Sequence, residues 1–248
     1  MKKMMITSCF LACLCCAFAA AEDGEDKAIK WSGDASLGAT FTRGNSHTDD
    51  LNLTGNAVRR SEIGRLTLGA SYFYGRQKDV VTRDESTTKD SWFLQGKYDY
   101  FMSEKLYLFA NGRYEQDKIA DLNERIVLGT GLGYQWIETP TFGFSTEAGT
   151  AWVHEDYDNA NNSNWSGQAG YALECALNDS VKFIHTTKYY PVLEDFNDFL
   201  LTSQAELRSS LTKSMFASFK VSMDYDSTPA AGQKYLDTRY IVGIGIGF

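Results

Sequence analysis

Apolar and polar residues alternate along most of this chain. From Trp31 to Phe41, one set of alternate positions holds Trp, Gly, Ala, Leu and Phe, whereas the other holds mostly Ser, Asp and Thr. Such alternation places apolar side chains on one face of a β-strand and polar side chains on the other. The same pattern recurs in residues 51–57, 66–74, 92–100, 106–114, 126–136, 142–152, 165–177, 181–189, 199–211, 215–225 and 236–248. The pattern therefore predicts twelve strands.

The positions of Trp favour a membrane barrel over a soluble β-sandwich, which would show similar alternation. Beyond residue 30 no run reaches 18 consecutive apolar residues, so the sequence predicts no transmembrane helix. Aromatic side chains that flank an aliphatic band are typical of strands crossing a lipid bilayer. We expect as membrane-interface anchors the residues on the apolar face near the predicted strand ends, namely Trp31, Trp92, Trp136, Trp152, Trp165 and Phe248.

The connections between the predicted strands also fit a barrel. One set is short: 61–64, 102–105, 137–141, 178–180 and 212–214. The other set is longer and more polar: 44–50, 76–90, 116–124, 155–164, 190–198 and 226–235. Outer-membrane barrels have short periplasmic turns and longer extracellular loops. The sequence predicts an all-β fold: a single transmembrane antiparallel β-barrel of about 12 strands, with both termini in the periplasm.

The amino terminus predicts export. Lys2 and Lys3 precede a mostly apolar stretch, and cleavage after Ala19 or after Ala21 fits the small residues that follow. We interpret residues 1–21 as a signal peptide, 22–29 as a short periplasmic tail and 30–248 as the outer-membrane β-barrel. Four of the five cysteines would leave with the signal peptide, so Cys175 would have no disulfide partner within the mature chain. The predicted location is the outer membrane of a Gram-negative-type bacterium.

The last predicted strand resembles an insertion signal. Tyr240, Val242, Ile244 and Ile246 occupy alternate positions and lead to Phe248. A row of this kind resembles the signal by which bacterial outer-membrane barrels are recognised for insertion. We therefore expect the barrel assembly machinery, acting through this strand, as one partner, and the lipid bilayer with lipopolysaccharide as the other. The net charge of −8 argues against nucleic acid as a partner.

The polar face predicts the contents of the lumen. Its basic residues are Arg65, Lys97, Arg113, Arg125, Lys182, Lys188, Arg208, Lys220 and Arg239, and its acidic residues are Asp34, Asp99, Glu115, Asp117, Glu147, Glu174, Glu206, Asp224 and Asp237. The two sets balance. We select as lumen charges Arg113, Glu115, Glu147, Arg208, Asp224 and Arg239. Either the lumen passes small hydrophilic solutes with little charge preference, or paired side chains fill it, as a 12-stranded barrel lies between filled and wet barrels in size.

Several motifs resemble one family. They are Thr42 to Thr48 running into Asp50 to Leu53, Tyr98 to Phe101, Tyr114 to Asp117, and Arg125 to Gly129 leading to Gly131 to Tyr134. In these motifs the chain resembles the salt-stress-induced bacterial outer-membrane proteins, a domain family of unknown function. The resemblance implies an outer-membrane barrel and a link to salt stress, and it supplies no catalytic or binding residues.

The sequence favours a protein without catalysis, serving envelope integrity or passive permeation of small solutes. The alternative is an outer-membrane lipid hydrolase that uses a lipid-facing pair, His185 and Ser203. No outward Asn or Asp neighbours His185, and the pair lies near the middle of its strands. We expect no cofactor and no metal: Asp156 to Asn161 begins like a calcium loop, but Ala160 occupies a ligand position.

Overall fold

The computed structural model describes residues 30–42, 46–79, 83–229 and 235–248, and the account below concerns the unit from Trp31 to Phe248. The predicted signal peptide and periplasmic tail lie outside the described residues. Twelve strands form: β1 (Lys30–Thr42), β2 (Ser46–Arg60), β3 (Gly64–Asp79), β4 (Glu85–Phe101), β5 (Leu106–Asp117), β6 (Leu122–Glu138), β7 (Phe142–Tyr157), β8 (Ala160–Ala176), β9 (Val181–Pro191), β10 (Phe199–Ser210), β11 (Met215–Asp226) and β12 (Leu236–Gly247).

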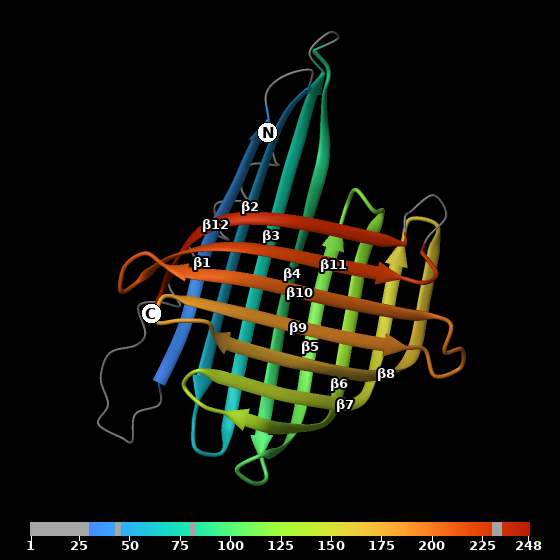
Figure 1. Ribbon diagram of the computed structural model, residues 1–248. Helices are drawn as coiled ribbons and strands as arrows, with labels where there is room; N and C mark the ends of the chain where they lie inside the picture. The colour runs from blue at the N-terminus through green and yellow to red at the C-terminus, as the bar shows by residue number, and fades with distance from the viewer. Residues whose placement is uncertain (1–29, 43–45, 80–82, 230–234) are drawn as a thin grey trace. The chain divides into compact units, whose positions relative to one another are not determined.

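The strands form one closed antiparallel barrel in which each strand lies beside its neighbours in sequence. β12 pairs with β1, with Asp34 opposite Gly247, and the backbone N–H groups of Gly33 and Phe248 donate to each other's carbonyl oxygens at 3.1 and 3.0 Å. In Figure 1, β9 to β12 cross the strands of the opposite wall at a steep angle. The prediction of a 12-stranded antiparallel barrel is confirmed.

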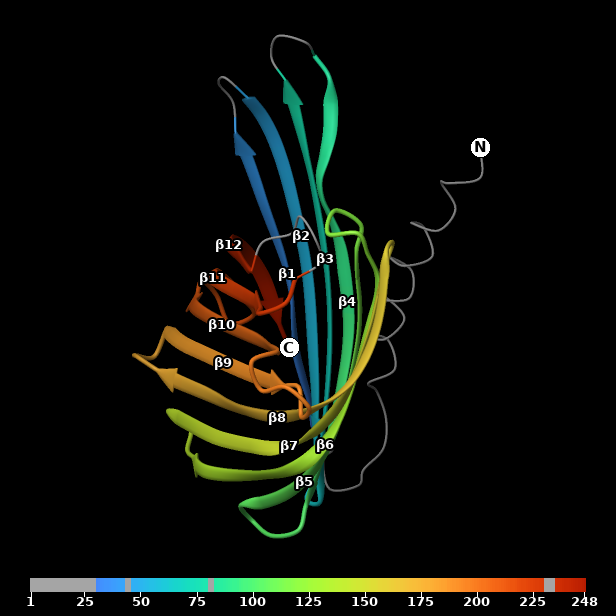
Figure 2. The same cartoon turned by 90° about the vertical axis from the view of Figure 1, so that its right-hand side faces the viewer.

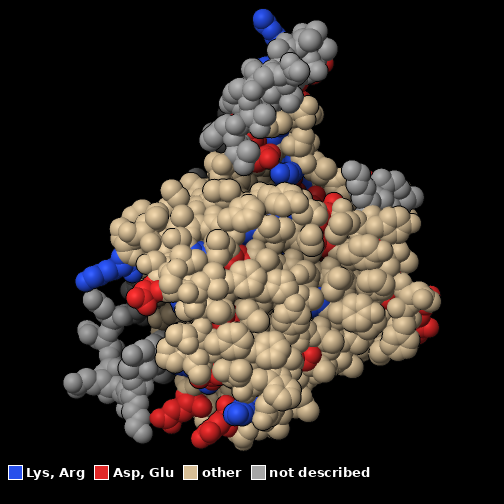
Figure 3. Space-filling model, viewed as in Figure 1, with Lys and Arg blue, Asp and Glu red and all other residues tan. Residues whose placement is uncertain are grey.

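The barrel has its apolar side chains outside and its polar side chains inside. Many large apolar residues lie exposed on the outer face, and seven of them are 41–65% exposed: Leu37, Leu68, Leu108, Leu128, Phe219, Val242 and Ile244. Asp99 and Glu206, on the inner face, are 0% and 5% exposed. Figure 3 shows an outer face mostly without charged side chains, which gather at its margins. This is the reverse of a soluble protein, and it is the arrangement of a barrel that faces lipid.

The connections at the two ends of the barrel differ less in length than the sequence predicts. At the turn end, the connections are 61–63, 102–105, 139–141, 177–180 and 211–214, close to the predicted ones. At the loop end, four predicted loops are largely strand. β3 continues to Asp79 and β4 begins at Glu85, while only residues 158–159 separate β7 from β8. Longer connections remain at 192–198 and 227–235.

The strands lengthen at the loop end because ion pairs replace apolar alternation there. Asp49 on β2 pairs with Arg76 on β3 at 3.5 Å, and Lys78 on β3 pairs with Glu85 on β4 at 2.9 Å. In Figure 2, β1 to β4 extend well beyond the other strands at this end. Side chains of both parities are polar in this extension, so the period-2 signal that marks a half-buried strand disappears although the strand continues.

Candidate functional site

The candidate site is the interior of the barrel, which holds a cavity of about 770 Å³. Residues near the turn end line it, among them Ser210, Thr212 and Lys213. Residues at the loop end line it too, including Asp226 and Pro229. The cavity therefore reaches both ends of the barrel. Polar side chains from nearly every strand surround it, because the inner face is the polar face of each strand.

One group of charges, the Asp99 cluster, consists of Arg65, Lys97, Asp99 and Glu147. Arg65 Nε and Lys97 Nζ each lie 2.7 Å from a carboxylate oxygen of Asp99, which has no exposed side-chain surface. Lys97 also pairs with Glu147 from β7, three strands away, and the Tyr107 hydroxyl donates to Glu147 Oε1 at 2.8 Å. The cluster contains two positive and two negative charges, so it is neutral by itself.

A second group, the Glu206 cluster, links β1 to β10 and β11 nearer the turn end. Arg208 contacts Asp34 at 3.1 Å and Glu206 at 2.9 Å, and Lys220 contacts Glu206 at 3.5 Å. Asn56 donates a further hydrogen bond to Asp34 at 3.2 Å. This cluster again has two charges of each sign, and its Arg208–Asp34 ion pair connects strands that are not neighbours in the sheet.

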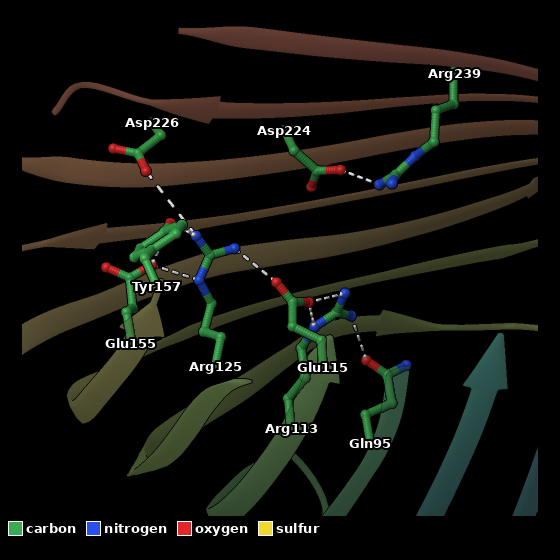
Figure 4. A network of polar contacts seen from close by, with 9 residues as sticks. All are labelled: Gln95, Arg113, Glu115, Arg125, Glu155, Tyr157, Asp224, Asp226 and Arg239. Carbon is green, nitrogen blue, oxygen red and sulfur yellow. Dashed lines mark hydrogen bonds and ion pairs between the residues drawn. The ribbon is translucent and has the colours of Figure 1, made fainter. Parts of the chain in front are cut away.

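The third group, the Arg125 cluster, lies toward the loop end and is shown in Figure 4. Arg125 contacts Glu115 at 2.6 Å and Glu155 at 2.5 Å, and it donates a hydrogen bond to the Tyr157 hydroxyl at 3.0 Å. Its remaining contact, at 3.9 Å, is with Asp226 on β11, five strands away. A single guanidinium thus connects two walls of the barrel, which narrows the lumen here.

The six predicted lumen charges all lie on the inner face. Arg113 pairs with Glu115 in the Arg125 cluster, and Arg239 pairs with Asp224 beside it. Arg208 belongs to the Glu206 cluster and Glu147 to the Asp99 cluster. Five of the six line the cavity: Arg113, Glu115, Arg208, Asp224 and Arg239.

Some interior residues were missed by the sequence analysis. Glu155 was assigned to a loop, although continuing the alternation of β7 from Glu147 would have placed it inside. Tyr157, in the same predicted loop, joins the Arg125 cluster through its hydroxyl, and the alternation did not predict that the hydroxyl of the inward Tyr107 joins the Asp99 cluster. Of the predicted inward charges, Lys182 and Glu174 lie at the turn-end rim, where their side chains are more than half exposed.

The predicted interface anchors lie on the outer face. Trp31, Trp136, Trp165 and Phe248 are 42–62% exposed, and Trp152 stands opposite Trp165 and stacks on the His154 ring. The expectation that each lies near a strand end is wrong for Trp92, which is near the middle of β4 because that strand begins seven residues earlier, at Glu85. The anchoring role of all six residues stays a prediction.

The lipid-facing pair of the alternative hypothesis does come together. In the register of β9 and β10, Ala205 is directly opposite His185, and Ser203, two residues away, is opposite Thr187. This offset of two residues keeps both side chains on one face, and His185 Nε2 lies 3.3 Å from Ser203 Oγ. His185 Nδ1 lies 2.8 Å from the Tyr171 hydroxyl, and Thr187 Oγ1 lies 3.1 Å from Ser203 Oγ. These four residues form a hydrogen-bonded chain near the middle of the outer face.

Two searches of the described residues found no candidate. Within these ranges no helix is long and apolar enough to cross a membrane. Nor do three or more His, Cys, Asp or Glu side chains of the described segments gather in a way that could hold a metal ion. The predicted calcium-like segment is not a loop, because Asp156 and Tyr157 end β7 and Ala160 begins β8.

Comparisons with known proteins place the chain in a family. The "Uncharacterized protein YdiY" of Escherichia coli (strain K12) is 22% identical over 214 residues, which cover 86% of this chain and 82% of that protein. The solved NanC porin is 10% identical, with a TM-score of 0.49, covering 88% of this chain and 98% of that one. The COG4313 outer membrane channel from Pseudomonas putida F1 is 9% identical, with a TM-score of 0.49, covering 91% and 98%. A family model matches residues 35–248, and the chain therefore belongs to the family described as "Protein of unknown function, DUF481".

Proposed function

We propose that this protein is a non-enzymatic barrel of the outer membrane of a Gram-negative-type bacterium, through which small hydrophilic solutes permeate passively. The observation that carries the proposal is the cavity of about 770 Å³, whose lining residues come from both ends of the barrel. A polar lumen inside an apolar wall provides a route for solutes that the hydrocarbon excludes.

The geometry also limits the size of the solute. Tyr107 and Phe109 on the inner face are fully buried and Phe216 is 6% exposed, so bulky rings take up part of the interior. The three ion-pair clusters narrow it further. Solutes the size of hydrated ions and small metabolites fit this lumen better than oligosaccharides or peptides do.

Planar-bilayer conductance of the purified, refolded protein tests this function. Ser222→Trp places an indole in the cavity lining, and we expect it to lower the unit conductance. Val221→Trp, one residue away on the outer face, is the matched control and should conduct like the wild type. A wild-type protein that conducts no more than bare lipid would overturn permeation and leave a filled barrel that serves envelope integrity.

Lipid hydrolysis has less support. The chain of Tyr171, His185, Thr187 and Ser203 contains a hydroxyl beside an imidazole, but an oxyanion needs free backbone or side-chain donors close to the nucleophile. Ser203 lies within the continuous ladders that join β10 to β9 and β11, where the backbone N–H groups are used by the sheet. We therefore assign these four residues to the stability of the outer wall.

The orientation in the membrane follows from the two ends. We propose that the turn end, where β1 begins and β12 ends, faces the periplasm, that both chain termini lie in that compartment, and that an amino-terminal signal peptide is removed on export. A protease site inserted at Asn159, in the β7–β8 connection, should be cut on intact cells. The same site at Lys213, in the β10–β11 connection, should be cut only after the outer membrane is opened. Cleavage at Lys213 alone on intact cells would invert the orientation.

The remaining proposed partners are the barrel assembly machinery, which would engage β12, and lipopolysaccharide on the outer leaflet. Deleting Phe248 should reduce the amount of assembled barrel in cells, because it removes an outward aromatic ring and the two backbone hydrogen bonds with Gly33. Gly247→Ala should be assembled normally, since the nearest atom to an added Cβ is 3.6 Å away. Equal assembly of the two variants would contradict this role of Phe248.

The link to salt stress rests on the family resemblance. If it holds, a deletion strain should grow more slowly than the parent in high salt and at the same rate in low salt. Equal growth of the two strains in both media would remove the link.

A further inference from the structure

Lys188 differs from the other cations of the lumen. Arg65, Lys97, Arg113, Arg125, Lys182, Arg208, Lys220 and Arg239 each pair with a carboxylate. The side chain of Lys188 makes neither a hydrogen bond nor an ion pair with any residue in the part of the chain that the structure describes. An unpaired ammonium group inside a barrel is costly, because its charge is partly removed from bulk water.

The Lys188 side chain borders open space within the cavity. It is on the inner face of β9, between Gly170 of β8 and Thr202 of β10, and it lines the cavity. Gly170 contributes no side chain, and the backbones approach closely there, since an added Cβ would lie 2.7 Å from the Thr187 carbonyl oxygen and 3.5 Å from Lys188 Cγ. Because Gly170 has no side chain, β8 places no polar group directly opposite Lys188.

The surroundings do not neutralise this charge. The carboxylates that act on Lys188 are Glu147 and Asp99, and both are already held by Lys97 in the neutral Asp99 cluster. Lys97 and Arg113 act on Lys188 with the same sign of charge as its own. This section of the lumen thus carries a surplus of one positive charge, which a mobile anion from solution would balance.

We infer that Lys188 forms an anion-binding subsite in the lumen, suited to a small monovalent anion such as chloride or the carboxylate group of a small solute. The route to the site rests on the proposed permeation, but binding needs access from one end of the barrel only. The subsite gives this section of the lumen a preference for anions, which the sequence count of nine basic and nine acidic residues does not predict.

Two measurements on the full refolded protein test the subsite, one with and one without ion flow. In planar bilayers with a KCl gradient, we expect the reversal potential of Lys188→Met to shift toward that of K⁺ relative to the wild type. Lys188→Arg should retain the wild-type value, since it keeps the charge. Lys182→Met removes a cation that is paired with Glu174 at the rim, and it should have little effect. Heat-dependent electrophoretic mobility would show whether each variant is folded.

The second measurement uses NMR of lysines carrying ¹³C-methyl labels, titrated with sodium formate and with sodium chloride. The resonance that is missing in Lys188→Met is assigned to Lys188, and we expect it to shift and saturate, whereas that of Lys182 should not saturate. Saturation without any wild-type conductance would support the subsite while overturning permeation. Conductance with an unchanged reversal potential in Lys188→Met, or a Lys188 resonance that behaves like that of Lys182, would overturn the subsite and leave permeation standing.

Discussion

The same strands form the inner and the outer face of the barrel wall, but the inner face is polar and the outer face is apolar. On β5, Ala110 is exposed on the outer face, while its neighbour Asn111 accepts a hydrogen bond from Gln168 of β8 at 3.1 Å. Most charges of the inner face pair with charges of the opposite sign in clusters. Among the described residues, the centre of the outer face carries no charged side chain, and its polar side chains on β8 to β10 form hydrogen bonds with one another. A polar side chain is stable on the inner face because it has hydrogen-bonding or charged partners there, and an apolar side chain is stable on the outer face because it faces lipid.

The largest expected effect comes from breaking an inner cluster. Asp99→Ala leaves Arg65 and Lys97 without their fully buried partner, and removing one member of a buried ion pair costs about 3–5 kcal/mol. The free energy of unfolding in urea, measured in lipid vesicles, tests this. Glu174→Ala breaks the exposed rim pair with Lys182 and should cost about 0–1 kcal/mol. Similar costs for both variants would mean that water screens the Asp99 cluster fully.

A charge on the outer face gives the next effect. Ala110→Arg places a cation in hydrocarbon and should cost about 2–4 kcal/mol, whereas Asn111→Arg, on the inner face, should cost much less. The two unfolding free energies are compared in the same vesicles. Equal damage from the two substitutions would indicate a soluble β-sandwich and would remove both the membrane barrel and its lumen.

Adding a methyl group at a glycine should lower the free energy of unfolding on the inner face and leave it unchanged on the outer face. A Cβ at Gly133, on the inner face, would lie 2.2 Å from the ring of Tyr107, which holds Glu147. Gly133→Ala should therefore cost about 1–3 kcal/mol through overpacking. Gly96 faces outward, and its Cβ would lie 3.7 Å from Leu68 Cδ2. Gly96→Ala should leave the free energy of unfolding unchanged, and an equal loss at both positions would contradict the assigned packing.

The smallest effect is expected from the hydrogen-bonded chain on the outer face. Ser203→Ala removes the hydroxyl next to His185 Nε2, and interactions of this kind within membranes average about 0.6 kcal/mol. The outward control is Ala205→Ser, which adds a hydroxyl opposite His185. A loss of several kcal/mol in Ser203→Ala would show that the four residues stabilise the wall more than a single hydrogen bond allows.

The sequence could predict the strands and their faces because both depend on a local period of two. Leu108 and Phe109 show this, since one is exposed to lipid and the other fully buried, as their parity requires. The strand ends near Asp79 and Glu85 could not be predicted, because charged pairs extend the ladder after the apolar alternation has stopped. Local pattern therefore describes the part of each strand that faces lipid and not the part beyond it.

The ion-pair partners inside the lumen could not be predicted from the sequence, for a different reason. Arg125 meets Asp226 across five strands, and Lys97 meets Glu147 across three. Such contacts depend on the tilt and stagger with which the barrel closes, which alternation does not report. The sequence shows that nine basic and nine acidic residues balance on the inner face. It does not show that the Lys188 side chain lacks a partner, because that depends on how all the other charges pair in space.

The seam between β1 and β12 sets the order of events in folding. Every other neighbouring pair of strands is consecutive in the sequence, but Asp34 and Gly247 are brought together across nearly the whole chain. Closing a longer loop costs more chain entropy, at about 0.6 kcal/mol for each doubling of its length. The hairpins can therefore form early, while the seam waits until β12 has been synthesised and exported. Until then β1 and β11 present unpaired backbone N–H and C=O groups. An unclosed barrel of this kind is unstable in lipid, and its free edges can pair with strands of another chain.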